Sequence, residues 1–146
     1  SGQRFSATKI KNYVDYGTSK EFFLETRKTV TLFCDFDGVI VKNSSKFSKT
    51  PWQYIPIQNN ITALKEKLNL SESSTLIITT CRPFSEKDNI LKFCKDQQIS
   101  VREVITDLPH SKRYLINDFS LSNPYPTSVA INIPRNNDNI DDYLKN

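Results

Sequence analysis

Two aspartates follow an apolar stretch of the chain and are separated by a single residue. Residues 29–34 (TVTLFC) are β-branched or apolar almost throughout, and they lead into Asp35, Phe36, Asp37 and Gly38. Carboxylates at positions i and i+2 leave a strand on the same side, and the glycine permits a sharp turn that exposes them. One carboxylate can attack phosphorus, while the other protonates the leaving oxygen and later deprotonates a water. The pattern therefore favours phosphoryl transfer, although Asp and Gly are also common in plain turns.

A divalent cation is expected beside this pair. Two carboxylates so close repel each other, and a cation between them relieves that repulsion. Mg²⁺ needs few protein ligands when a substrate phosphate supplies the others. Mg²⁺ is thus the predicted cofactor.

The elements that must position these residues alternate between strand and helix. Apolar and β-branched runs predict strands at 29–35, 75–80, 101–105, 113–117 and 129–133, and helical spacing predicts helices at 60–68, 85–98 and 138–144. Such alternation is typical of an α/β fold with a parallel sheet of about five strands and flanking helices, in three layers. The first two strands are apolar enough to be buried on both faces. Ligands of such sheets bind at the carboxyl ends of the strands, where Asp35 lies.

The run F-C-D-F-D-G-V-I-V at residues 33–41 resembles the first motif of the haloacid dehalogenase (HAD) superfamily. The resemblance covers residues 30–146 and implies a Rossmann-like phosphatase domain at 29–146, preceded by an extension or linker at 1–28. It implies Asp35 as nucleophile and Asp37 as general acid/base. The side chain of Asp35 and the backbone carbonyl of Asp37 would bind Mg²⁺.

Three further motifs follow from the same resemblance. Thr80, with Thr79 as its alternative, would bind phosphate at the end of the second strand. Lys112 would stabilise negative charge near the nucleophile, with Arg113 as the alternative, although the chain has Leu108-Pro109 where relatives often carry Lys-Pro. Asp118 would be a metal ligand, with Asn117 standing where some relatives have another aspartate.

The remaining polar candidates concern the substrate. Gly38, Arg82 and Arg113 are candidate substrate-binding residues, and Arg82 is equally compatible with a packing role.

His110 is the single histidine and is interpreted as a surface residue. Cys34, Cys81 and Cys94 are an odd, sparse set without CxxC spacing, so neither a disulfide framework nor a zinc site is expected.

The segment between the first two motifs is too short for a large cap domain. Asp35 and Thr80 are 45 residues apart, and a helix uses part of that length. The turn-rich residues 42–58 are expected to form a flap, where Trp52 and Tyr54 either offer a docking surface or pack on the core. We therefore expect an open site, unless a homo-oligomer partner or another domain of the same polypeptide covers it.

The N-terminal region carries a second resemblance. Asp15, Gly17, Thr18 and Phe22 fit the D-x-G-T-x-x-x-[FYW] segment near the end of sugar-nucleotidyltransferase domains, and residues 117–126 (NDFSLSNPYP) resemble relatives in bacterial surface-polysaccharide (capsule) pathways. The chain has no Met and begins Ser-Gly, which indicates a piece of a longer protein. These features imply the C-terminal phosphatase half of a bifunctional enzyme acting on a sugar phosphate.

The composition and charge of the chain limit the classes of ligand and the location that we expect. The net charge of +4 is mild and the lysines are dispersed, which favours a phosphorylated small molecule over nucleic acid. No apolar run approaches the roughly 18 residues that span a membrane, so the cytoplasm is the expected location. The predicted activity is phosphomonoester hydrolysis of a sugar phosphate. The alternatives are a nucleotidase or other small-molecule phosphatase, or a catalytically weak domain with an assembly or regulatory role.

Overall fold

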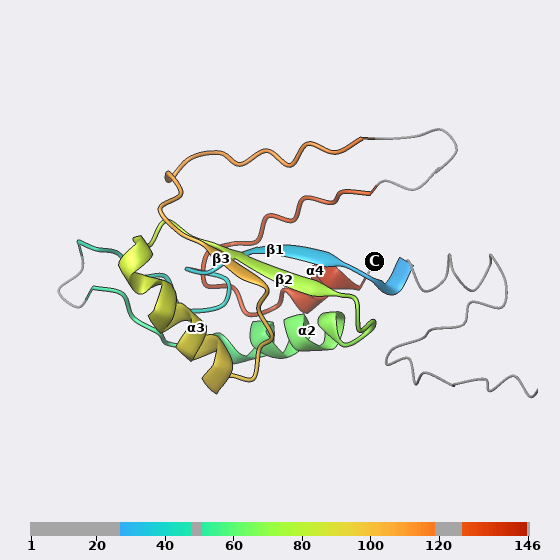
Figure 1. Ribbon diagram of the computed structural model, residues 1–146, viewed down its shortest axis with the longest axis horizontal. Helices are drawn as coiled ribbons and strands as arrows, with labels where there is room; N and C mark the ends of the chain where they lie inside the picture. Colours follow the sequence, from blue (N-terminus) through green and yellow to red (C-terminus); the bar gives the residue numbers. More distant parts are fainter. Residues whose placement is uncertain (1–26, 48–50, 119–126, 146) are drawn as a thin grey trace, which may run out of the picture.

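A parallel three-stranded sheet with helices packed against it organises the chain (Figure 1). The computed structural model describes residues 27–47, 51–118 and 127–145. Its strands lie in the order β1-β2-β3. The elements in chain order are β1 (Thr31–Asp35), α2 (Gln58–Leu68), β2 (Thr75–Thr79), the 3₁₀ helix η1 (Phe84–Glu86), α3 (Lys87–Asp96), β3 (Glu103–Ile105) and α4 (Asp141–Leu144). An α/β fold with a parallel sheet is thereby confirmed.

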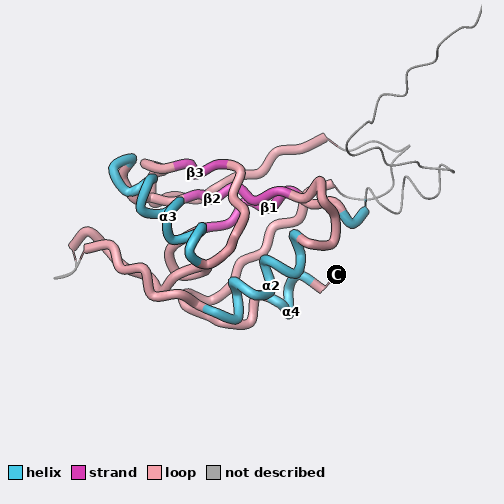
Figure 2. Tube along the Cα trace, turned by 60° about the horizontal axis from the view of Figure 1, so that its bottom comes forward, coloured by secondary structure: helices cyan, strands magenta, loops and turns pink. Residues whose placement is uncertain are grey.

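The core lies on one face of this sheet. Alternate side chains of the strands, such as Cys34, Leu76 and Ile78, are buried against α2 and α3, which lie on that face (Figures 1 and 2). On the opposite face Phe33 is 54% exposed. The predictions of strands buried on both faces and of three layers are therefore wrong for the described residues, because no described helix covers the second face. Apolar composition alone does not distinguish a doubly covered strand from one with an open side.

The helices agree closely with the sequence pattern. In α2 a stripe formed by Asn60, Ile61 and Leu64 is buried, as the spacing requires. The helix predicted from residue 85 begins as η1 and continues as α3, whose Ile90, Phe93 and Cys94 are buried. Within the described ranges, no helix is long and apolar enough to cross a membrane.

Within the described residues, the predicted fourth and fifth strands do not form. Residues 112–118 and 127–133, here called the arm, are extended but belong to no sheet, and they run back above the open face (Figure 1). Tyr114 and Ile116 are 79% and 91% exposed. A strand parallel to its neighbour needs a crossover of about a dozen residues or more. Residues 106–112 connect β3 to the predicted fourth strand without a crossover helix.

A buried asparagine fastens the C-terminal segment to the sheet. Asn60 Nδ2 donates to the carbonyl oxygens of Val39 (2.8 Å) and Asn137 (2.7 Å), and its Oδ1 accepts from the backbone N–H of Ile140 (3.1 Å). The residue is fully buried. One side chain thus joins α2, the turn after β1 and the segment that leads into α4.

We expect Asn60→Ala to lower the free energy of unfolding by about 2–4 kcal/mol, because it leaves buried backbone groups without hydrogen-bond partners. Urea denaturation measures this change. Asn59→Ala is the matched control, since Asn59 is exposed and makes one 3.4 Å hydrogen bond to Asp138. Equal effects of the two substitutions would contradict the role of Asn60.

The thiols provide an independent check of burial. Cys34 and Cys94 are buried and Cys81 is exposed. Burial raises the pKa of the Cys94 thiol to about 12, so it stays protonated and unreactive at pH 8. Iodoacetamide at pH 8 should modify Cys81 alone in native protein and all three thiols in urea, as mass spectrometry would show. Rapid native labelling of Cys94 would contradict the packing of α3.

Candidate functional site

The two aspartates lie at the carboxyl end of β1, where the chain turns sharply. Gly38 has φ +87°, and its N–H donates to the carbonyl oxygen of Val41 (2.7 Å). An L-residue rarely adopts this φ, which accounts for the glycine. Asp35, Asp37 and Gly38 line a cavity of about 960 Å³. Both aspartates therefore line the cavity, but the Asp35 side chain is 38% exposed and that of Asp37 only 16%.

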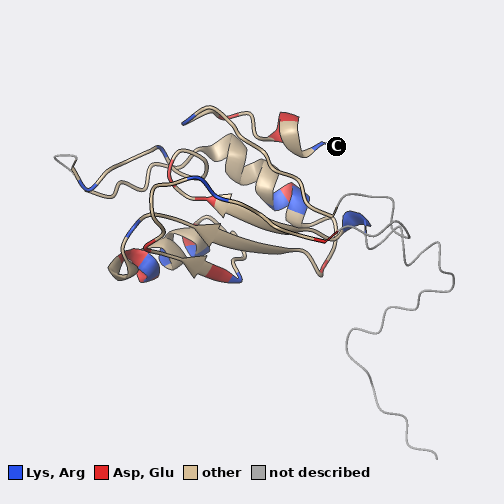
Figure 3. Ribbon diagram, turned by 90° about the horizontal axis from the view of Figure 1, so that it is seen from above, with Lys and Arg blue, Asp and Glu red and all other residues tan. Residues whose placement is uncertain are grey.

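Asp35 faces a cation from a distant part of the chain. Arg113 Nη1 lies 3.4 Å from Asp35 Oδ1, and the carboxylate is 38% exposed. Burial raises the pKa of Asp35, and Asp37 raises it further, while the charge of Arg113 offsets part of the rise. Of the two alternatives for the charge-stabilising residue, Arg113 is therefore the one that contacts Asp35. Figure 3 shows the acidic end of β1 beside segments that carry basic residues.

Asp37 is held by a buried arginine. Arg82 Nε donates to Asp37 Oδ2 (2.9 Å) and Arg82 Nη2 donates to Asp37 Oδ1 (2.7 Å), a bidentate pair. Arg82 is completely buried, and the Asp37 side chain is 16% exposed. Burial lowers the pKa of Arg82, but its hydrogen bonds and attraction to Asp37 raise it more, so it remains charged. Arg82 therefore does not line the cavity, and the packing alternative fits better than substrate contact.

The same guanidinium anchors the flap. Its Nη2 also donates to the carbonyl oxygen of Gln53 (2.7 Å) and to Ser44 Oγ (3.2 Å). The guanidinium carbon of Arg82 lies 4.5 to 5.1 Å from the ring centroids of Phe36, Trp52 and Tyr54. These distances are typical of cation–π contacts. These contacts fold residues 42–47 and 51–57 over the end of β1. Tyr54 packs against core rings, as one of its two predicted alternatives states.

The threonines at the end of β2 form hydrogen bonds with other residues of this chain. Thr80 is buried, and its hydroxyl donates to Asp37 Oδ2 (3.4 Å) and accepts from the backbone N–H of Arg82 (3.1 Å). Thr79 Oγ1 donates to the carbonyl oxygen of Cys34 (3.4 Å). Neither residue lines the cavity. In this arrangement Thr80 orients Asp37, and its role in binding phosphate stays a prediction.

The loop after β3 supplies the opposite wall of the cavity. Lys112 lines it together with Arg113, and both are exposed. His110 also lies there, with its Nδ1 3.8 Å from Cys81 Sγ. His110 is exposed, as expected for a surface histidine.

Asp118 is not brought to the carboxylate pair. It is exposed at the described end of the arm, where Asn117 Nδ2 donates to Thr127 Oγ1. Among the described residues, no group of three or more His, Cys, Asp or Glu side chains could hold a metal ion. The predicted set of Asp35, Asp37 and Asp118 is therefore not assembled, because the arm is not paired with β1.

Three contributors to the site lie outside every predicted motif. Arg135 lines the cavity, Ser44 Oγ donates to Asp37 Oδ1 (3.3 Å), and Asn60 fixes the turn behind them. Asn60 had a signal, since it is a polar residue within the apolar stripe of a helix. No sequence pattern pointed to Ser44 or Arg135, because both lie in loops.

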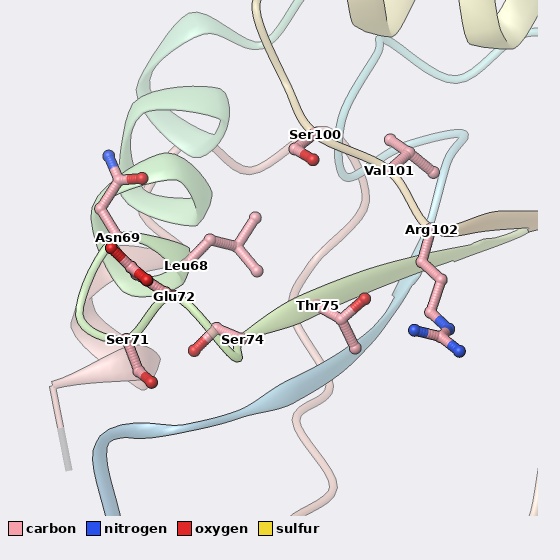
Figure 4. A pocket seen from close by; sticks show the side chains of 9 residues that line it. All are labelled: Leu68, Asn69, Ser71, Glu72, Ser74, Thr75, Ser100, Val101 and Arg102. Carbon is pink, nitrogen blue, oxygen red and sulfur yellow. The ribbon is translucent and has the colours of Figure 1, made fainter. Parts of the chain in front are cut away.

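A second cavity lies at the other end of the sheet. It has a volume of about 320 Å³ and lies between the end of α2 and the amino end of β2, with Leu68 pointing toward the strand (Figure 4). None of the predicted site residues lines it. It is therefore separate from the carboxylate site.

Comparisons with known proteins do not extend the assignment. No protein-family model, no curated protein and no solved structure matches this chain.

We expect Arg82→Met to lower the free energy of unfolding by about 3–5 kcal/mol, because it leaves the Asp37 carboxylate largely buried without its partner. Thermal and urea denaturation measure the loss. Lys87→Met is the matched control, since Lys87 forms an ion pair of 2.6 Å with Glu103 at the surface. Removing the Lys87 side chain should cost much less, because this ion pair is exposed to solvent.

A double-mutant cycle with Asp37→Asn separates the pair from other contacts of Arg82. The two substitutions should be strongly non-additive, since each removes the same interaction. Additive effects, or an Arg82→Met loss no larger than that of Lys87→Met, would contradict the anchoring role.

Proposed function

We propose that this chain is a Mg²⁺-dependent phosphomonoester hydrolase of the HAD type, acting on a sugar phosphate through an aspartyl-phosphate. The observation that carries the proposal is Asp35, a partly exposed carboxylate in a cavity of about 960 Å³ with Arg113 3.4 Å away. A nucleophile beside a cation, at the carboxyl end of a parallel strand, suits attack on an anionic substrate.

The proposed reaction has two steps. In the first, an Asp35 carboxylate oxygen forms a bond to phosphorus while the bond to the leaving oxygen breaks, and Asp37 gives that oxygen a proton. In the second, water attacks the aspartyl-phosphate, Asp37 accepts the proton, and phosphate leaves with Asp35 regenerated. Arg113, with Lys112 on the same wall, stabilises the charge of the transferring group.

The surroundings of Asp37 bear on its role. Each carboxylate oxygen accepts one hydrogen bond from Arg82 and one from Thr80 or Ser44, so a proton on either oxygen displaces one of these donors. Accepting a proton from water therefore requires that one of these hydrogen bonds break. Thr80 and Ser44 also donate to this carboxylate, which fixes its orientation toward the cavity.

The residues present fit only part of a Mg²⁺ site. Asp35 and the backbone carbonyl of Asp37 are the donors that the resemblance implies, and Asp118 does not join them. The set of three donors is therefore incomplete among the described residues. Mg²⁺ dependence remains part of the proposal because Mg²⁺ readily uses one or two carboxylates together with substrate phosphate.

A HAD-like sheet with more strands than the three described is part of the same proposal. β1 lies at an edge of the described sheet, so its free edge is where a further strand of a HAD-like sheet would pair. The link to a nucleotidyltransferase domain depends on residues 15–22, and the polysaccharide resemblance depends largely on 119–126. Both segments lie outside the described residues. Cytoplasmic location and covering by another domain or subunit stay predictions.

A second candidate is a weakly catalytic domain with a role in assembly. The separation of Asp118 from the other aspartates favours it, as do the exposed Tyr114 and Ile116 of the arm. This candidate predicts folded protein that binds ligands without turnover.

We expect Mg²⁺-dependent phosphate release from at least one member of a panel of sugar phosphates and nucleotides. Asp35→Asn should reduce kcat by roughly a thousand-fold or more, because the amide cannot form the phosphoryl ester. Asp96→Asn, an exposed aspartate at the end of α3, is the control and should retain activity. A preference for nucleotides would favour the nucleotidase alternative.

Two outcomes would overturn the proposal. Turnover that survives in Asp35→Asn would exclude this nucleophile. Absence of turnover on every substrate, with folded protein and saturating Mg²⁺, would favour the assembly role. Chelation of Mg²⁺ by EDTA without loss of activity would contradict the cofactor alone.

A further inference from the structure

Trp52 is the flap residue whose indole faces the same cavity as the aspartates. Three rings surround the Arg82 guanidinium, and of these Phe36 and Tyr54 pack in or against the core. Trp52 is the one of the three that lines the cavity, and it is partly exposed there. Because two other rings already pack against Arg82, contact with the guanidinium does not by itself account for an indole in the cavity wall.

The backbone holds this indole in an unusual conformation. Trp52 has φ +52°, in the left-handed region that bulky L-residues rarely adopt. The next residue is fixed at both of its backbone polar groups: Gln53 N–H donates to Ser44 Oγ (3.2 Å), and its carbonyl oxygen accepts from Arg82 Nη2 (2.7 Å). Such conformations persist where surrounding contacts impose them, and they are concentrated at active sites and ligand-binding sites. Phe47 also lines the cavity, but it is 87% exposed and so offers a less fixed surface.

The indole lies close to the carboxylate that handles the leaving oxygen in the proposed reaction. Arg82 forms a bidentate pair with Asp37 and a cation–π contact with Trp52, so a single guanidinium separates the carboxylate from the indole. The group bonded directly to the leaving oxygen is therefore the part of a substrate within reach of Trp52. The base of a nucleoside 5′-phosphate lies a whole ribose further from that oxygen.

An indole face suits a ring rather than another charged group. Ligand sites combine a few polar groups, which fix orientation, with aromatic side chains that cover the remainder of the ligand. Asp35, Lys112 and Arg113 are polar groups of this cavity, and Trp52 is its fixed aromatic surface. A sugar ring presents C–H groups on its faces, and these can pack flat against an indole.

We propose that Trp52 is a specificity residue that stacks on the ring bearing the phosphate. The preferred substrates are then phosphate monoesters whose ester oxygen is bonded directly to a ring carbon, as in an aldose 1-phosphate. The identification of such esters as substrates rests on the proposed hydrolase function. The ring subsite itself can be tested by binding alone.

The test compares ligands of equal charge. Cyclohexyl phosphate has a saturated ring on its ester oxygen without the hydroxyl pattern of any one sugar, and ethyl phosphate has no ring. Isothermal titration calorimetry uses the Asp35→Asn variant with Mg²⁺, so that neither ligand is hydrolysed. We expect cyclohexyl phosphate to bind at least about 5-fold more tightly, because its additional methylene groups are buried against the indole.

Trp52→Ala in the same background should reduce that preference to about 2-fold or less and leave the affinity for ethyl phosphate within about 2-fold, since the charged contacts remain. Trp52→Phe should keep most of the preference, because a smaller ring still offers a face for packing. Phe84→Ala is the matched control, since Phe84 is 70% exposed and lies outside the cavity lining. Melting curves verify that each variant is folded.

The fluorescence of Trp52 gives a second readout that needs no substitution of this residue. Trp52 is the single tryptophan of the chain, so the tryptophan emission reports this side chain alone. Saturating cyclohexyl phosphate should shift the emission to shorter wavelength and reduce its quenching by acrylamide, because the stacked ring excludes water from the indole. Saturating ethyl phosphate should change both much less.

Four results would overturn the inference: no saturable binding of cyclohexyl phosphate, a preference that is absent or that survives in Trp52→Ala, emission changes that are equal for the two ligands, or a larger Trp52-dependent preference for AMP over ribose 5-phosphate. The last result would place a nucleobase on the indole. If the preference holds but the wild type hydrolyses no ester, the ring subsite stands and the hydrolase function fails. If esters are hydrolysed but Trp52→Ala leaves their order of affinity unchanged, the hydrolase function stands and the ring subsite fails.

Discussion

The buried pair of Asp37 and Arg82 holds the site together. It joins the turn after β1 to the end of β2, and through Gln53 and Ser44 it fastens the flap to both. A buried charge pair is costly unless its hydrogen bonds are satisfied. Here the carboxylate accepts from several donors, and the guanidinium lies among three aromatic rings. Of the buried side-chain nitrogen and oxygen atoms in the described residues, Arg82 Nη1 alone has no hydrogen-bond partner, and it lies 3.9 Å from Glu86 Oε2.

This arrangement gives the two aspartates different environments. Asp37 is saturated with donors and held in one orientation, whereas Asp35 faces the cavity with a single cation nearby. Nearby carboxylates can serve different roles when their surroundings differ in this way. Asp35 is the more exposed of the two and the one proposed to attack phosphorus, whereas the acid/base role proposed for Asp37 rests on the family resemblance.

Much of the fold followed from local patterns. The apolar runs at 29–35 and 75–80 and the helical stripe at 60–68 each appear as an element, because these short stretches have strong preferences of their own. The runs at 113–117 and 129–133 carry the same preference but have no partner strand. Pairing depends on the course of the preceding chain, and residues 106–112 lead from β3 into the arm without a crossover helix. Propensity alone could not reveal that course.

The features of the candidate site likewise fall into two groups: those that neighbouring residues determine and those that depend on the tertiary structure. The sequence by itself determined that Asp35 and Asp37 lie at the end of a strand with Gly38 in the turn, because this arrangement depends on neighbouring residues only. The tertiary structure decided that Arg82 binds Asp37, that Arg113 reaches Asp35, and that Arg135 joins the cavity. It also left Asp118 apart from the aspartates it was expected to join. These relations bring together residues 45 to about 100 positions apart, and only the packing of sheet, flap and C-terminal segment determines which of them meet.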